Sequence, residues 1–267
     1  MLGDRLENIR RRRPRVHCMA NHVTANDCAN LLLAVGGCPI MADEPMESEE
    51  ITSCCAALAI SLGTPSERRF EAMRRSLAQA KRMEIPVILD PVGVTASSFR
   101  RAFAQELLGM GGVTVIRGNA PEIRTLGGEA VAACGVDAAG EERLADVKRM
   151  ACRLAKETGA IVIVTGKTDV VTDGERICIV HNGDPVMKAI TGAGCQLTAL
   201  LGAFFAANAE QPFEAAIAAV CMMGLCAQQA KARMTPQEGN ASCRNFVIDA
   251  AYRMTRKELE EGAEYEL

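Results

Sequence analysis

The sequence has no uninterrupted apolar run long enough to cross a membrane. A spanning helix needs roughly 18 or more consecutive apolar residues, and the apolar runs here are much shorter. The opening residues, from Met1 to Glu7, also lack the apolar segment that follows the charges of a secretory signal. We therefore expect a cytoplasmic protein that does not contact the membrane.

A large excess of charge of one sign is also missing. The 30 Lys and Arg side chains nearly balance the 33 Asp and Glu side chains, which leaves a formal net charge of -3. The one dense basic run covers residues 10–15, and a solvated helix end explains it better than a phosphate-binding surface does. A nucleic-acid partner is therefore not expected.

Metal-binding spacings of cysteine and histidine are absent. None of the 12 cysteines forms a Cys-x-x-Cys pair, and His17, His22 and His181 do not recur at the i, i+4 spacing of a helical ligand pair. The cysteines are scattered through apolar segments of a long chain, so a disulfide scaffold is disfavoured as well. We expect buried free thiols in a reducing compartment and no zinc site.

What the sequence does contain is an alternation of short apolar runs with longer amphipathic segments. Runs that are apolar and β-branched almost throughout are typical of strands buried on both faces, and helices between them are typical of a parallel sheet. We therefore predict an α/β fold with a mostly parallel central sheet and helices on both faces. The expected strands cover residues 15–19, 56–60, 86–90, 113–116 and 161–164, and the expected helices cover residues 24–35, 66–83, a segment near Pro121, and 141–158.

The pattern changes after Thr165. Residues 169–180 alternate as a hairpin turned at Asp173-Gly174, which would add antiparallel strands at one edge of the sheet. Later segments are rich in alanine and apolar around much of their circumference, as in buried helices or a subunit interface. No linker or composition shift divides the chain, so one domain covering residues 1–267 is expected. The alanine-rich segments cover residues 195–208, 212–232 and 242–260.

A glycine-rich turn, Gly192-Ala193-Gly194-Cys195, leads directly into one of these helices. Backbone N–H groups at a helix start have no partner within the helix and carry the positive end of its dipole, so they can bind an anion; glycine lets the anion come close. Cys195 falls in the first turn, where the dipole would lower the pKa of its thiol. The alternatives are a helix cap without a ligand and one more buried core thiol.

Two familiar phosphate motifs do not fit the sequence. Gly166-Lys167-Thr168 resembles the end of a P-loop, but Ile161 stands where that motif needs glycine, and a hairpin follows in place of a helix. The dinucleotide-binding motif fails because Leu197 stands where its third glycine belongs. Neither a P-loop nucleoside triphosphatase nor a dinucleotide enzyme is supported.

Two carboxylates are expected at the sheet edge where open α/β folds bind ligands. Asp90 closes a predicted strand, and Glu122 begins a helix after Asn119. Carboxylate oxygens beside an anion site are what Mg²⁺ with a nucleotide phosphate requires. Asp90, which precedes Pro91, could instead form a turn, and Glu122 could instead only offset a helix dipole.

Together these segments resemble the hydroxyethylthiazole kinase family of the ribokinase-like superfamily. The resemblance runs from about Val16 to Tyr252, and several blocks in the family's order are more specific than any one motif. The blocks are Val16-His17-Cys18-Met19-Ala20-Asn21, Thr24-Ala25-Asn26, Cys38-Pro39-Ile40-Met41-Ala42-Asp43, Leu89-Asp90-Pro91-Val92-Gly93, Ile116-Arg117-Gly118-Asn119, Val164-Thr165-Gly166 and Thr191-Gly192-Ala193-Gly194-Cys195.

The resemblance implies a ribokinase-like three-layer fold and an activity. That activity is ATP-dependent, Mg²⁺-assisted phosphorylation of the primary alcohol of 5-(2-hydroxyethyl)-4-methylthiazole, in thiamine biosynthesis or salvage. By match to the family's motifs, Met41 and Gly192 would contact the thiazole, and Asn21 would border that pocket. The family is also homotrimeric, with sites at subunit interfaces.

The same match implies roles for residues at the phosphate end. Arg117 and Thr165 would bind ATP, and Asp90 and Glu122 would hold or orient the metal.

The glycine-rich turn would serve the transferring phosphoryl group. The backbone of Gly192, Ala193 and Gly194 would form an anion hole for the charge that develops in a loose transition state. Most ribokinase-like enzymes have an Asp that accepts the alcohol proton at the position of Cys195. Cys195 is therefore assigned the role of base or of alcohol positioning.

Two positions depart from the family pattern near the expected substrate mouth: Ala20 stands where Thr is common, and Ser61 where Asn is common. A kinase of the same fold for a pyrimidine or another small hydroxymethyl compound therefore stays open. So do a thiazole- or nucleotide-binding protein without catalysis, which would not need the full phosphate site, and a structural oligomer, which would not explain the glycine-rich turn.

Overall fold

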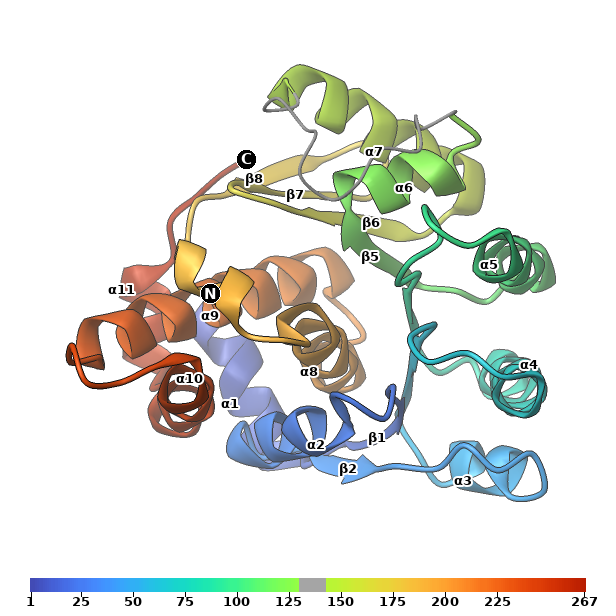
Figure 1. Cartoon of the computed structure of the whole chain (residues 1–267), viewed down its shortest axis with the longest axis horizontal. Coiled ribbons are helices and arrows are strands. Elements are labelled where there is room, and N and C mark those ends of the chain that lie inside the picture. The colour runs from blue at the N-terminus through green and yellow to red at the C-terminus, as the bar shows by residue number, and fades with distance from the viewer. Residues whose placement is uncertain (130–142) are drawn as a thin grey trace.

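The computed structural model describes residues 1–129 and 143–267. A nine-stranded sheet of order β2-β1-β3-β4-β5-β6-β7-β8-β9 runs through the molecule, with helices on both faces (Figure 1). Strands β1 to β6 pair in parallel, and β7, β8 and β9 pair antiparallel. The predicted α/β fold with a mostly parallel sheet and an antiparallel edge is confirmed. The strands are β1 (Arg15–Met19), β2 (Cys38–Ile40), β3 (Ala57–Ser61), β4 (Val87–Asp90), β5 (Val115–Asn119), β6 (Ile161–Thr165), β7 (Asp169–Thr172), β8 (Ile177–Val180) and β9 (Tyr265–Glu266).

The sheet separates two hydrophobic cores. Alternate residues of one strand point to opposite faces, so Ala57 and Ala59 of β3 pack into one core, and Leu58 and Ile60 pack into the other. One face is covered by α1 (Leu2–Arg12), α2 (Ala25–Ala34), α8 (Ala193–Ala207), α9 (Pro212–Arg233), α10 (Asn240–Arg253) and α11 (Arg256–Gly262). The other face carries α3 (Ser48–Ser53), α4 (Glu67–Arg82), α5 (Ser98–Met110), α6 (Ala120–Leu126) and α7 (Leu144–Thr158).

The alanine-rich helices α8 and α9 are buried, as one of the two sequence interpretations predicts. Within the described ranges, α9 is the one helix long and apolar enough to cross a membrane by length and composition. However, 78% of its apolar window is buried, and α9 packs against α8 and α10. The 11 cysteines of the described residues are all free, as expected. Eight of them are buried, but Cys38 and Cys152 are only half-buried and Cys54 is exposed, so the expectation that all the thiols are buried is wrong for these three.

Several element boundaries differ from the prediction. The single helix expected over residues 242–260 is wrong, because α10 ends at Arg253 and α11 begins at Arg256. Between them, the Thr255 hydroxyl accepts a hydrogen bond from the Glu258 N–H at 3.1 Å, and Glu258 accepts one from the Thr255 N–H at 2.8 Å, so a capping box starts a new helix. Residues 141 and 142 of another predicted helix lie outside the described residues, and α7 begins at Leu144.

Elements with weak sequence signals were not predicted. They are α1, β2, α3, α5, β9 and a short 3₁₀ helix, η1 (Pro185–Ala189). The basic run at residues 10–15 does end a helix, since α1 stops at Arg12 and Arg13 takes a left-handed conformation.

The parallel part of the sheet brings distant segments to one edge. Because β1 to β6 run in the same direction, the residues that follow them meet along their carboxyl ends. These include Asn21 after β1, Met41 after β2, Asp90 at the end of β4 and Thr165 at the end of β6.

Candidate active site

The glycine-rich turn begins α8 in a conformation that only glycine adopts easily. Gly192 caps the helix with φ of 80°, in the left-handed region, and a Cβ atom there would lie 2.9 Å from Cβ of Thr24 at the start of α2. The helix starts with the Gln196 N–H donating to the Gly192 carbonyl at 2.9 Å, and Gly192 itself has no side chain that could cap the first turn. Backbone N–H groups at a helix start of this kind can bind an anion.

Arg117 of β5 lies directly against this turn. A Cβ atom on Gly194 would lie 2.7 Å from Nη2 of Arg117, so the guanidinium rests on the backbone of the turn. Nη2 donates to Oγ1 of Thr165 at 2.7 Å, across the neighbouring strands β5 and β6. The structure thus brings together the two residues predicted to bind ATP and the predicted anion hole.

Asp90, at the end of β4, carries a fully buried carboxylate. Neither oxygen has a hydrogen bond of ordinary geometry to the described residues. The side chains of Cys195 and Thr198 nevertheless lie close enough to stabilise the ionised carboxylate slightly. Its ion-pair contact is to Nη1 of Arg117 at 3.5 Å. Burial raises the pKa of Asp90 to about 6; the Arg117 guanidinium opposes this rise, and the nearby Glu122 carboxylate adds to it.

Glu122 is held by backbone groups at the start of α6. Its Oε2 accepts from the Asn119 N–H at 2.9 Å, which completes a capping box, and its Oε1 accepts from the Gly93 N–H at 3.1 Å. Glu122 therefore does lie in the first turn of a helix, as the sequence predicts. The same hydrogen bonds also fix its carboxylate beside Asp90.

The two carboxylates suit a cation that keeps much of its water. In the part of the chain that the structure describes, no group of three or more His, Cys, Asp or Glu side chains could hold a metal. Mg²⁺ typically takes one or two carboxylates, with waters and substrate phosphates completing its coordination. The unbonded oxygens of buried Asp90, close to Glu122, fit that requirement.

Cys195 lies in the first turn of α8, where a network of polar side chains meets its sulfur. Nδ2 of Asn21 donates to Sγ at 3.3 Å, and Oγ of Ser61 lies 3.5 Å from it. Burial raises the pKa of the Cys195 thiol to about 12, and the negative charge of Asp90 adds to the rise. The predicted lowering of this pKa is therefore wrong, because lost hydration and a neighbouring carboxylate outweigh the helix dipole.

The residues predicted to contact the thiazole lie at the same edge of the sheet. Asn21 is buried, and its Oδ1 accepts from the Val23 and Thr24 N–H groups at 3.0 and 3.2 Å, which leaves its amide aimed at Cys195. Met41 follows the edge strand β2 and is 38% exposed. The adjacent Ala42 carbonyl is 2.9 Å from Nε2 of buried His17, which ties this loop to β1.

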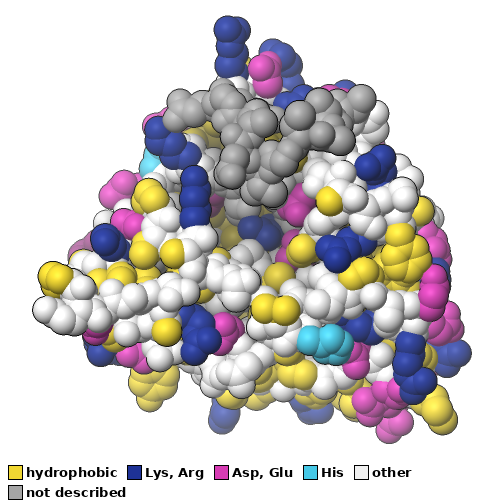
Figure 2. Space-filling view, in the orientation of Figure 1, with side chains coloured by type: hydrophobic (Ala, Val, Ile, Leu, Met, Phe, Trp, Pro, Cys, Tyr) yellow, Lys and Arg dark blue, Asp and Glu magenta, His cyan; other side chains and the backbone are white. Residues whose placement is uncertain are grey.

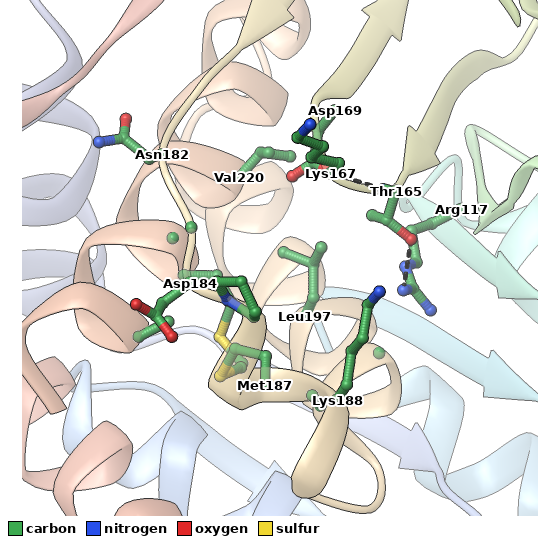
Figure 3. Close-up of a pocket in the computed structure, with 18 residues that line it drawn as sticks. Arg117, Thr165, Lys167, Asp169, Asn182, Asp184, Met187, Lys188, Leu197 and Val220 are labelled. Carbon is green, nitrogen blue, oxygen red and sulfur yellow. Dashed lines mark hydrogen bonds between the residues drawn. The ribbon is translucent and has the colours of Figure 1, made fainter. Parts of the chain in front are cut away.

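A cavity of about 330 Å³ opens beside the glycine-rich turn. Figure 2 shows this face of the molecule hollowed, with Lys and Arg side chains within and around the hollow. Arg117, Thr165, Ala193 and Gly194 line it, so the predicted phosphate residues form one wall (Figure 3). The remaining lining residues were not predicted, and they come from the segment after β6, from β7 to η1, and from α8 and α9: Gly166, Lys167, Asp169, Asn182, Gly183, Asp184, Pro185, Met187, Lys188, Leu197, Val220, Met223, Gly224 and Ala227.

The unpredicted lining residues divide by chemistry. Met187, Leu197, Val220 and Met223 give an apolar part, and Figure 3 shows Lys188 extending from η1 toward the end that holds Arg117. This division suits a ligand with one apolar and one anionic end.

Asp169 adds a carboxylate to the cavity wall. Its Oδ1 accepts from the Gly166 N–H at 2.8 Å, and burial raises the pKa of Asp169 to about 6. The position of Lys167 and Asp169 just beyond β6, at the edge that holds Thr165, is the sequence signal that could have identified them.

The fold defines a class. The pyridoxal kinase of Staphylococcus aureus, solved in complex with AMP-PCP and pyridoxal, superposes with a TM-score of 0.60 over 80% of this chain and 87% of that one. At 19% identity this likeness concerns the fold alone. The protein thus has the ribokinase-like fold.

Closer similarity identifies the family. The model of the hydroxyethylthiazole kinase family matches residues 6–257. The hydroxyethylthiazole kinase of Clostridium acetobutylicum is 43% identical over 272 residues, which cover 100% of this chain and 99% of that protein. The solved hydroxyethylthiazole kinase of Pyrococcus horikoshii is 33% identical, with a TM-score of 0.88 over 99% of this chain and 98% of that one. The chain belongs to the hydroxyethylthiazole kinase family.

Proposed function

We propose that this protein transfers the γ-phosphoryl group of ATP to the primary alcohol of hydroxyethylthiazole, as a step of thiamine biosynthesis or salvage in the cytoplasm. The observation that carries the proposal is the arrangement of Arg117 on the backbone of Gly194, between buried Asp90 and a cavity of about 330 Å³. Family membership supplies the substrate class, and this geometry supplies a phosphate site where that chemistry can occur.

The nucleotide would lie in the cavity with its base in the apolar part. Its phosphates would then reach Arg117, Thr165 and Lys188, whose cationic and hydroxyl groups bind phosphate oxygens. The N–H groups of the turn from Gly192 to Gly194 would receive the equatorial oxygens of the transferring group. Fixed donors stabilise charge that builds up on those oxygens without reorganising during the reaction.

Asp90 and Glu122 would hold Mg²⁺, through its water in part, beside the phosphates. The ion would neutralise charge on the β- and γ-phosphates and align them. For the protein, the consequence is that Asp90 must be ionised when nucleotide binds, although burial disfavours that state.

For Cys195, the neutral thiol favours alcohol positioning over the role of base. A thiol with its pKa raised to about 12 is almost wholly protonated at neutral pH, so it is a poor proton acceptor. It can donate to or accept from the substrate hydroxyl while Asn21 holds its sulfur. In a loose transition state the alcohol oxygen forms its bond to phosphorus as the bond to the β-phosphate oxygen breaks. The alcohol proton leaves late and can pass to an oxygen of the transferred phosphoryl group, so placement matters more than a strong base.

We further propose that Met41, Gly192 and Asn21 form the thiazole pocket and that a homotrimer completes it. Met41 is partly exposed, and two large apolar side chains in nearby loops, Val23 and Met46, are 63% and 88% exposed. Apolar side chains exposed near a ligand site are typical of a surface that a second subunit covers. The mass of the particle in solution, measured by light scattering, tests the trimer.

A substrate panel tests the proposed activity. Purified protein, ATP and Mg²⁺ are incubated with hydroxyethylthiazole, a hydroxymethylpyrimidine or pyridoxal, and the products are identified by mass spectrometry. We expect the thiazole phosphate to form fastest. Faster phosphorylation of the pyrimidine would instead support the alternative that Ser61, which contacts Cys195, shifts the pocket to another alcohol. No product from any alcohol, despite nucleotide binding, would favour a non-catalytic binding protein.

A further inference from the structure

A buried arginine on the face of the sheet opposite α8 ties together the loops of the substrate end. Arg69 of α4 is 4% exposed, and its hydrogen bonds reach the loops that follow β1, β2 and β3. The short contacts run from Nη2 to the Ala20 carbonyl at 2.7 Å, from Nε to Oδ2 of Asp43 at 3.0 Å, and from Nη1 to the Gly63 carbonyl at 2.7 Å. One planar guanidinium therefore fixes the spacing of three separate loops.

The third loop contains backbone strain that Arg69 stabilises. Thr64 has φ of 43°, a left-handed conformation that is costly for a β-branched residue. Nη1 of Arg69 donates to both the carbonyl oxygen and Oγ1 of Thr64 at 3.0 Å. The Arg69 side chain, which also donates a hydrogen bond to the Gly63 carbonyl, therefore holds the strained turn in place.

A direct route of contacts connects this turn to the predicted thiazole pocket. A Cβ atom on Gly63 would lie 2.7 Å from Nδ2 of Asn21, so the Asn21 amide packs directly on the Gly63 backbone. Nδ2 of Asn21 in turn donates to Sγ of Cys195. Asp43, which Nε of Arg69 binds, lies two positions after Met41.

We propose that Arg69 is a positioning residue that sets the shape of the alcohol-substrate pocket, acting through Gly63 on Asn21 and through Asp43 on the Met41 loop. The inference rests on the proposed function and names a determinant of its substrate end. Burying a guanidinium costs free energy, and an apolar side chain would serve packing alone at least as well. Within the described residues, the hydrogen bonds of Arg69 all go to the alcohol end, whereas the cavity proposed for the nucleotide is lined by residues of β5, β6, β7, η1, α8 and α9 and of the loops after β6 and β8.

The test compares variants of Arg69 with a matched neighbour. Arg69→Lys keeps the charge but loses the planar fork, and Arg69→Met keeps the volume but loses all the bonds. Arg68→Met is the control, because Arg68 is exposed and, among the described residues, pairs at the surface with Glu44. For each variant, kcat and KM for hydroxyethylthiazole and the Kd for AMP-PCP are measured well below the melting temperature.

We expect both Arg69 variants to raise the KM for the thiazole about tenfold or more, which is the effect of losing one or two net hydrogen bonds. The Kd for AMP-PCP should stay within about twofold of wild type, and Arg68→Met should change neither quantity. An unchanged KM in a folded Arg69→Lys variant would overturn the inference. Equal losses of thiazole and nucleotide affinity would also overturn it, since they would indicate general destabilisation.

Hydrogen exchange separates this inference from the proposed function. If Arg69→Met does not fold, Arg69→Lys and Asp43→Asn serve in its place. In Arg69→Lys, amide exchange should accelerate in residues 20–24, 41–43 and 61–64 and stay unchanged in residues 182–190. Wild-type protein that phosphorylates no alcohol would refute the proposed function, and the exchange pattern would then decide the role of Arg69 by itself. Uniform or absent acceleration would refute that role.

Discussion

The buried carboxylate of Asp90 should make the metal-free protein less stable at neutral pH than it would be with an uncharged side chain there. The group has a pKa of about 6 in the folded protein, compared with 3.8 for an unperturbed Asp. Each pKa unit corresponds to about 1.4 kcal/mol, so ionised Asp90 costs the folded state about 3 kcal/mol. The attraction of Arg117 is already contained in that pKa.

The sign of the pH dependence follows from the raised pKa. Between pH 3.8 and about 6 the folded state binds more protons at Asp90 than the unfolded state does, so wild-type stability falls as pH rises through this range. Above about pH 7 the penalty is complete and constant. Asn cannot ionise, so Asp90→Asn should have nearly the stability of wild type at about pH 4 and be up to about 3 kcal/mol more stable at about pH 7.5.

Urea unfolding of both proteins with EDTA, at several pH values across this range, measures the difference. Asp169 also has a pKa raised to about 6, but it is present in both proteins and cancels. Asp249→Asn is the control, because Asp249 is 52% exposed and pairs at the surface with Arg233. Its effect should be under about 1 kcal/mol at every pH. A less stable Asp90→Asn protein at neutral pH, or a difference that does not change with pH, would refute the reasoning. Asp90→Asn should nevertheless lose turnover, because a functional site is often retained although it lowers the stability of the protein.

Three further predictions concern the phosphate end of the site. Gly192→Ala should destabilise the protein by about 2 kcal/mol, since alanine at φ of 80° is strained and its Cβ meets Thr24. Thermal melting measures this loss. Adding Thr24→Ser, which removes the crowding methyl group, should recover part of it. Cys195→Ser should lower kcat more than it weakens nucleotide binding, and an unchanged kcat would exclude Cys195 from the mechanism. In the wild-type protein, the plot of kcat against pH should show no transition at the ordinary pKa of a thiol. Lys188→Gln should weaken ATP more than AMP in calorimetric titrations, with less difference at high salt, and equal weakening would show that Lys188 does not bind the terminal phosphates.

The parallel direction of the strands explains why the sequence could predict that distant residues meet at one edge of the sheet. Asp90, Arg117, Thr165 and the turn at Gly192 lie far apart in the chain, but a parallel sheet brings the ends of its strands to one edge. The alternation of apolar runs was enough to predict that sheet, and the glycine-rich turn was enough to predict the start of α8. Short elements such as β2, whose three residues include Pro39, have too weak a signal to be predicted.

The remaining features depend on packing between elements and have no local signal. Met187, Val220 and Met223 form one cavity only because η1 and α9 lie over the same end of the sheet. The pKa of Cys195 could not be inferred from its place in a helix, since it is set by burial and by the charge of Asp90, which lies on β4. Arg69 appeared to be an ordinary charged residue of an amphipathic helix, and only the folded structure places its guanidinium among three loops.

The most direct test follows phosphorus through the reaction. A ³¹P NMR time course of purified protein with ATP, Mg²⁺ and hydroxyethylthiazole should show the γ-phosphate signal of ATP replaced by a phosphomonoester signal, in step with the appearance of ADP. The same reaction with EDTA, or with Arg117→Met, should show no phosphomonoester. Inorganic phosphate in place of the ester, or ester formation at the wild-type rate without Arg117, would contradict phosphoryl transfer to the thiazole at this site.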